Sequence, residues 1–81
     1  MEIGEWYRVE TVNPDNGKRE WKYYRVDEIY NDGTIGIEVY KIHWNGRISG
    51  RRKSQSSATA LEQCARVPEE VAKEELNLKD T

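Results

Sequence analysis

The sequence predicts a mainly β domain, in which four or five short antiparallel strands form a small bent barrel followed by one or two short C-terminal helices. Three observations predict this class. Asx-Gly pairs at Asn16-Gly17, Asp32-Gly33 and Asn45-Gly46 favour the positive φ angles of tight hairpin turns. The stretches between these pairs are rich in aromatic and β-branched residues, which are typical of strands. Helix-start signals then follow near the C-terminus.

The first two strands are expected at residues 5–12 and 20–30. Residues 5–12 alternate in polarity, which puts Tyr7 and Val9 on one side of the strand. The loop after this strand contains Pro and Gly, which suit a reversal of the chain. Bulky side chains fill the second strand, and the Asp32-Gly33 turn leads into the third.

In the third strand, residues 34–44, the bulky residues occupy odd-numbered positions at first and even-numbered positions later. Its bulky residues form two sets that would face opposite sides of a sheet: Ile35, Ile37 and Val39, then Tyr40, Ile42 and Trp44. Either a β-bulge near Val39–Tyr40 restores the face, or both faces of the sheet are partly covered. We expect the bulge, because strongly bent and bulged strands close small sheets into barrels.

The remaining chain is predicted to become polar and then helical. Residues 47–51 fit a short fourth strand, and residues 52–58 are polar enough to form a mobile loop. Thr59-Ala60-Leu61-Glu62 fits a capping box, and Pro68-Glu69-Glu70 fits the start of a second helix. We therefore expect one domain in three parts: a strand meander at 1–53, a polar loop at 54–58 and a helical extension at 59–81.

Size and composition point to one small domain. Its 81 residues allow only a thin core. The single cysteine, Cys64, excludes an intramolecular disulfide. The acidic N-terminal residues lack the apolar region of a signal peptide, and no stretch has the length of a membrane span. We expect a soluble cytoplasmic protein.

The formal net charge of −2 conceals a segregation of charge along the chain. Residues 41–53, here named the basic segment, carry five basic and no acidic side chains, whereas residues 1–40 and 54–81 sum to −4 and −3. Arginine presents paired donors to phosphate, and a nearby ring can stack on a base. We predict contact with nucleic acid or a nucleoprotein complex through Lys41, His43, Trp44, Arg47, Arg51, Arg52 and Lys53. The alternative is a solvated basic loop that neutralises the acidic C-terminal helix.

The segment from Tyr23 to Tyr40 combines an aromatic pair and Val26 with an Asp32-Gly33 turn and a β-branched strand that ends in an aromatic residue. In this it resembles the core hairpin of Tudor-type and other SH3-like barrels. The resemblance covers roughly residues 5–51. It implies an SH3-like barrel that acts as a binding module for methylated lysine or arginine, peptides or nucleic acid.

The resemblance also implies an aromatic binding surface, made by Tyr24, Tyr30, Tyr40 and Trp44. Aromatic rings hold cations by cation–π attraction. The same rings can instead be core residues or cross-strand pairs. A Tudor domain usually continues with aromatic-Gly-Asn, where this chain has Trp44-Asn45-Gly46.

Catalysis and metal binding have little support in the sequence. His43 and Cys64 are the only histidine and the only cysteine, and a polar segment separates them. A Cys-His nucleophile pair needs contact and a third orienting group, and a tetrahedral zinc site needs more ligands. The glycines fit turns and strand ends, not a phosphate-binding loop. We expect no enzyme activity, no cofactor and no metal.

Two other functions stay open. A small acidic chain with a charged helix suits a protein-binding adaptor or inhibitor, of a size that viruses and plasmids often encode, with Trp21 as an exposed contact. A nucleotide-capturing protein would stack a base on a ring and hold its phosphate with Arg47 or Arg51. An uncovered edge strand would also allow a homodimer.

Overall fold

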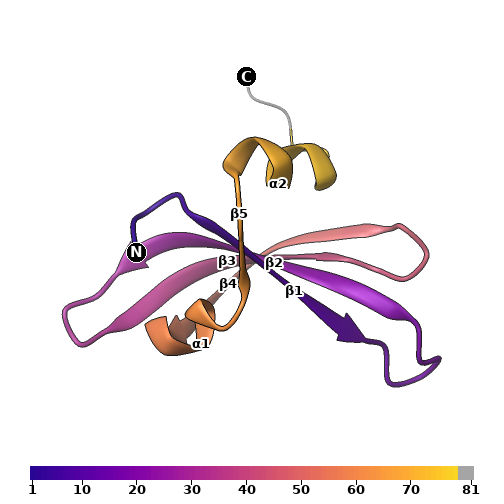
Figure 1. Cartoon of the computed structure of the whole chain (residues 1–81), viewed down its shortest axis with the longest axis horizontal. Coiled ribbons are helices and arrows are strands. Elements are labelled where there is room, and N and C mark those ends of the chain that lie inside the picture. Colours follow the sequence, from indigo (N-terminus) through magenta and orange to yellow (C-terminus); the bar gives the residue numbers. More distant parts are fainter. Residues whose placement is uncertain (79–81) are drawn as a thin grey trace.

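The computed structural model describes residues 1–78 and contains one antiparallel sheet with two short helices (Figure 1). The elements in chain order are β1 (Trp6–Val12), β2 (Arg19–Ile29), β3 (Thr34–Ile42), β4 (Ile48–Ser57), α1 (Ala58–Glu62), β5 (Ala65–Val67) and α2 (Glu69–Glu75). The strands lie in the order β4-β3-β2-β1-β5. The prediction of a mainly β fold with short C-terminal helices is confirmed, but the sheet of the described residues is open and not closed into a barrel.

The three predicted Asx-Gly turns are all present. Each of their glycines has a positive φ angle, as a tight turn requires. Each Asx side chain accepts a hydrogen bond from the backbone amide two residues further on, and these amides belong to Lys18, Thr34 and Arg47. Asn and Asp therefore stabilise the turns through their side chains as well as through their backbone preferences.

Strand β3 has buried residues on both faces of the sheet. Ile35 and Ile37 are buried in a cluster with α1, whereas Tyr40 is buried in a cluster with α2. Pairing of β3 with β2 runs without interruption from Val39 to Ile42, so β3 keeps a regular alternation. A register shift does occur between Val39 and Lys41, but only against β4. The expectation that a bulge restores one face is wrong, because a different helix covers each face.

The two helices lie on opposite sides of the sheet, and β5 runs between them beside β1 (Figure 1). We call the side that contacts α2 the α2 face. Its buried residues are Trp6, Tyr23, Tyr40, Val67, Ala72 and Leu76. We call the other side the α1 face. Its buried residues are Tyr7, Val26, Ile35, Ile37 and Leu61.

Polar contacts also hold α2 against the sheet. The Glu75 carboxylate accepts hydrogen bonds from the Tyr23 hydroxyl at 2.9 Å and from Arg8 Nη1 at 3.1 Å. The Arg8 guanidinium lies 4.9 Å from the centre of the Trp21 ring. Burial, followed by the neighbouring Glu75, raises the pKa of the Tyr23 phenol, so this hydroxyl remains a donor at neutral pH. The helix is therefore fixed by both apolar and charged contacts.

The C-terminal part differs from the prediction at three points. Residues 52–57 belong to β4, not to a loop, because they pair with β3 from Val39↔Arg52 to Thr34↔Ser57. Ser57, not Thr59, caps α1, since its hydroxyl accepts the Ala60 amide at 3.1 Å. The short strand β5 was not predicted at all.

Candidate functional site

The basic segment forms the hairpin of β3 and β4 and the turn between them. Successive side chains of a strand point to opposite faces of the sheet, so the predicted binding residues of the basic segment are divided between the two faces and do not form one patch. Some of them are held by carboxylates of the same chain, and others are free. The distinction decides which side chains can bind a ligand, because a paired cation has already lost part of its attraction for an external anion.

Lys41 and His43 are held by the buried carboxylate of Glu20, which is only 1% exposed. One carboxylate oxygen lies 3.2 Å from Lys41 Nζ, and the other lies 3.5 Å from His43 Nδ1. The same carboxylate accepts hydrogen bonds from the Trp44 amide and from Asn13. Burial alone would raise the pKa of Glu20, but the Lys41 and Trp44 hydrogen bonds outweigh it, so the pKa is lowered.

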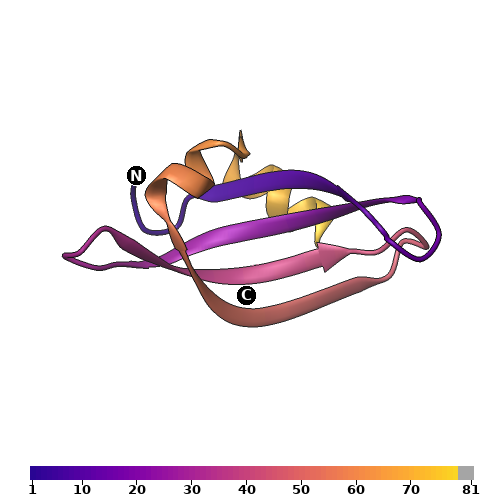
Figure 2. The same ribbon diagram turned by 90° about the horizontal axis from the view of Figure 1, so that it is seen from below.

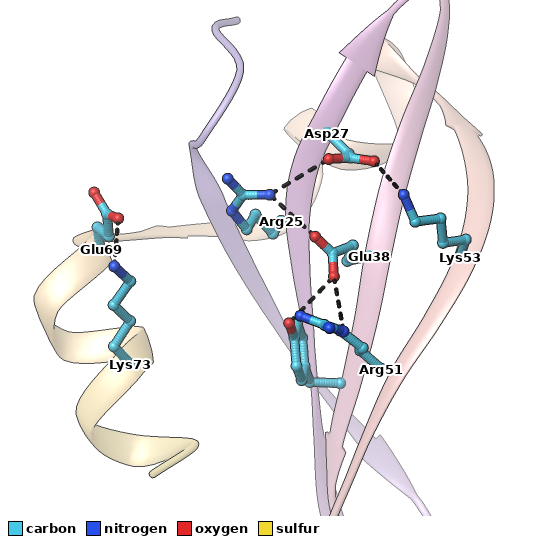
Figure 3. Close-up of polar contacts among 8 residues, drawn as sticks. Arg25, Asp27, Glu38, Arg51, Lys53, Glu69 and Lys73 are labelled. Atoms are coloured by element: carbon cyan, nitrogen blue, oxygen red, sulfur yellow. Dashed lines mark hydrogen bonds and ion pairs between the residues drawn. The ribbon is translucent and has the colours of Figure 1, made fainter. Parts of the chain in front are cut away.

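Arg51 and Lys53 are paired on the α2 face (Figure 3). Glu38 lies 3.8 Å from Arg51 Nε, and Asp27 lies 3.0 Å from Lys53 Nζ. Arg25 joins the two carboxylates, at 3.0 Å from Glu38 and 3.4 Å from Asp27. The Lys53 hydrogen bond is the main cause that lowers the pKa of Asp27. Both outer cations are about three-quarters exposed, at 73% and 76%, so their pairing is open to solvent screening.

Arg47 and Arg52 have no ion pair within residues 1–78. Arg52 lies opposite Val39 on the α1 face. On the same face Lys22 of β2 lies directly opposite Lys41 of β3, and Lys22 also has no ion pair among the described residues. Lys22 was not predicted as a site residue, because it lies in the acidic part of the sequence.

Lys22, Lys41 and Arg52 border two adjoining concavities on the α1 face, which we call the cationic groove. The volumes are about 280 and 300 Å³, and both concavities are lined by Lys22, Val39 and Arg52. The first also reaches Tyr24 and the polar end of β4, and the second reaches Lys41, His43 and Ser49. Helix α1 borders the first concavity through Ala60 and Leu61, whereas no α1 residue lines the second. The arrangement can therefore bind an anion from the open side of the sheet.

The predicted aromatic surface does not converge. Tyr40 is buried on the α2 face, 5.4 Å from the Trp6 ring, and Tyr24 is half-buried on the α1 face. Tyr30 and Trp44 are exposed, but they follow β2 and β3 at opposite ends of the sheet. The Lys18 ammonium lies 4.3 Å from the centre of the Trp44 ring. An aromatic cage is therefore not formed by these residues.

Trp21, which was expected to be exposed, is half-buried against the α2-face cluster beneath Arg8. It is therefore part of the packing of α2 and not an open contact for a protein partner. Among the predicted rings, Tyr24 lines the first concavity of the cationic groove and the buried Tyr40 lines the second.

His43 and Cys64 make separate contacts. His43 Nε2 contacts the Ser49 hydroxyl, and the Cys64 thiol contacts the Ala60 carbonyl oxygen at 3.7 Å. Burial raises the pKa of the Cys64 thiol, so it is protonated at neutral pH and a poor nucleophile. Within residues 1–78 no group of three or more His, Cys, Asp or Glu side chains is placed to hold a metal ion. No helix in that range has the length and apolar character to cross a membrane.

Comparison of the chain with protein-family models, with curated proteins and with solved structures gave no match.

Proposed function

We propose that the protein is a non-enzymatic binding module that contacts the phosphate backbone of nucleic acid, free or within a nucleoprotein complex, through the cationic groove. The observation that carries the proposal is the direct opposition of Lys22 and Lys41 across β2 and β3. Like charges directly opposite each other destabilise a sheet, and only Lys41 is paired with a carboxylate. A phosphate bound between these lysines and Arg52 would offset their repulsion.

The groove suits a single strand better than a duplex. Its concavities are small, at about 280 and 300 Å³, and Tyr24 borders one of them beside the cations. A ring next to a backbone-binding cation allows a base to stack while its phosphate is held. With a net charge of −2 the chain has weak long-range attraction for duplex DNA. Binding therefore depends on local contacts.

We also propose that the fold is an opened relative of the SH3-like barrels of Tudor type. Support comes from the hairpin of β2 and β3, in which the Asp32-Gly33 turn joins long strands, and from the register shifts near Asp27 and Tyr40, which bend a sheet. The proposal does not include binding of a methylated side chain, because the rings do not converge. We place the protein in the cytoplasm, in agreement with its single cysteine.

The test is fluorescence anisotropy with a labelled mixed-sequence single strand of twelve nucleotides, titrated at several salt concentrations. With up to three phosphates contacted, the slope of log K against log salt should be about −2. The Lys22→Gln/Arg52→Gln variant should bind at least about tenfold more weakly, because each lost phosphate contact removes a charge-assisted interaction. A duplex of the same sequence should bind more weakly than the single strand.

A matched control is the Arg19→Gln/Arg47→Gln variant, which changes the net charge equally but leaves the groove intact. It should bind within about twofold of the unaltered protein, because screening limits exposed charges to short range. Equal losses in both variants would show attraction by charge alone and contradict a groove. Competition by a mononucleotide at the affinity of the oligomer would favour nucleotide capture instead.

A further inference from the structure

Strand β4 forms a long open edge of the sheet. It has ten residues, whereas the opposite edge, β5, has three. Figure 2 shows β4 as the outer strand of the four long ones, with β1 on the far side. Within residues 1–78 no strand pairs with its outer side. An edge of this length is a template for a further strand.

The hydrogen-bond pattern shows which backbone groups of β4 are free. The His43 amide donates to the Arg47 carbonyl oxygen at 2.8 Å, so alternate residues of β3 from Ile35 onward turn their backbone groups toward β4. Their partners in β4 include Arg52, Ser54 and Ser56. The residues between these partners, Lys53 and Gln55, therefore turn both the N–H and the C=O away from the sheet. No backbone partner for these groups exists among the described residues.

We propose that β4 binds an extended acidic segment of a partner protein as a sixth strand. Only a peptide offers donors and acceptors that alternate as those of Lys53 and Gln55 do. The charge of the edge specifies the sequence of that peptide, since Arg51, Arg52 and Lys53 are consecutive and β4 contains no acidic residue. Arg52 lies on the α1 face, and Lys53 lies on the α2 face, where it is paired with Asp27 but is 76% exposed. Acidic side chains on either side of the added strand therefore meet an accessible cation.

A second copy of the chain fits this edge less well. Pairing two β4 strands would bring two clusters of three cations together, and like charges across a strand pair are destabilising. The proposal shares Arg52 with the cationic groove, but it rests mainly on the outward backbone groups of Lys53 and Gln55, which phosphate binding in the groove does not use.

The probe is a fluorescein-labelled peptide of alternating Glu and Val, with the matching peptide of Lys and Val as its charge control. A second control is the Glu-Val peptide with every amide N-methylated, which removes the backbone donors of both edges without changing charge. The acidic peptide should bind at least tenfold more tightly than either control. Amide hydrogen exchange at Lys53 and Gln55 should slow when it binds. Equal binding of the N-methylated peptide, or no binding at millimolar concentration, overturns the proposal.

Variants of the protein test the same edge without any change to the peptide. Gln55→Pro removes an outward N–H without breaking the β3–β4 ladder, as proline on an edge strand allows. It should lower peptide affinity at least tenfold, whereas Gln55→Thr should keep it within about twofold. Gln55 borders the first concavity, but its side chain lies on the α2 face, opposite to that of Arg52. Nucleic-acid binding should therefore survive Gln55→Pro and fail in Lys22→Gln/Arg52→Gln, which separates the two proposals. Self-association of the free protein that Gln55→Pro abolishes would assign the edge to a second copy instead.

Discussion

The two faces of the sheet are built from alternate residues of the same strands, yet they are covered very differently. Helix α2 contributes Ala72 and Leu76 to a continuous cluster on its face, and Glu75 ties it to Tyr23 and Arg8. Helix α1 has five residues and buries only Leu61. The α2 face is consequently a closed core, whereas the α1 face is a core at one end and an open groove at the other.

The cations on the two faces differ in the same way. On the α2 face the basic side chains lie within ion-pair distance of a carboxylate: Arg8, Arg19, Arg25, Arg51 and Lys53. On the α1 face Lys22 and Arg52 have no carboxylate partner within the described chain. Paired cations therefore lie on both faces, since Lys41 and Arg66 are paired on the α1 face, but the strand cations that lack a carboxylate partner in the described chain lie on the α1 face.

The largest effect should follow from removing the centre of the closed face. Trp6 is almost fully buried against Tyr40, and Trp6→Ala should cost about 3–5 kcal/mol of unfolding free energy. Tyr24→Ala on the open face should cost clearly less, because its ring is only half-buried. Urea denaturation measures both. Equal losses would show that the two faces contribute alike to stability.

A smaller loss should follow from crowding the closed face at β4. A Cβ atom on Gly50 would lie 2.3 Å from Cδ2 of the buried Tyr40 ring. Gly50→Ala should therefore cost about 1–3 kcal/mol, typical of an overpacked core. Gly36→Ala is the matched control, since its added Cβ would be 3.3 Å from the nearest atom, Cβ of Glu28. A thermal midpoint for Gly50→Ala equal to that of the unaltered protein would contradict this packing.

The buried carboxylate of the open face should give a pH-dependent effect. The pKa of Glu20 is lowered in the folded protein from its usual 4.5, so its contribution is complete above that value and is lost as pH falls through the folded pKa. Glu20→Gln should lower the urea midpoint at pH 7 and flatten the decline below about pH 4.5. Part of the decline should remain, because the pKa of Asp27 is also lowered. An unchanged acid profile would contradict the Glu20 network.

The smallest effect should have the opposite sign. Lys22→Gln removes the repulsion between Lys22 and Lys41, so it should stabilise the protein by about 0.2–1 kcal/mol. The gain should shrink as salt is added, since salt screens the repulsion. Arg25→Gln on the closed face should destabilise, because it leaves Glu38 and Asp27 without their shared partner. Destabilisation by Lys22→Gln would show that Lys22 has a structural role.

The hairpins were predictable from the sequence because Asn, Asp and Gly mark the turns directly. The opposition of Lys22 and Lys41 was not. If the register of the pair Ile29↔Ile35 continued unchanged along the two strands, Lys22 would lie opposite Ile42. The register shift between Val26 and Glu28 places Lys22 opposite Lys41 instead. A bulge of this kind has no clear local signature, so the cationic groove could not be derived from residue spacing.

The polar end of β4 illustrates a second limit of the sequence. Ser54, Gln55, Ser56 and Ser57 have little intrinsic preference for a strand, and their conformation follows from pairing with Ile35 and Ile37. The basic segment was correctly identified as a charge cluster, but its alternation across the sheet separates Arg52 from Arg51 and Lys53. Which of its cations are neutralised depends on Glu20, Asp27 and Glu38, which lie earlier in the chain.

The pairing of β5 with β1 has a consequence for the order of folding. This pairing places Val67 opposite Trp6, so it closes a loop that contains most of the chain. The hairpins of β2, β3 and β4 need only near neighbours and can form while the protein is being synthesised. Trp6 cannot be buried until α2 has left the ribosome. We expect the first strand to be the last to gain its full set of contacts.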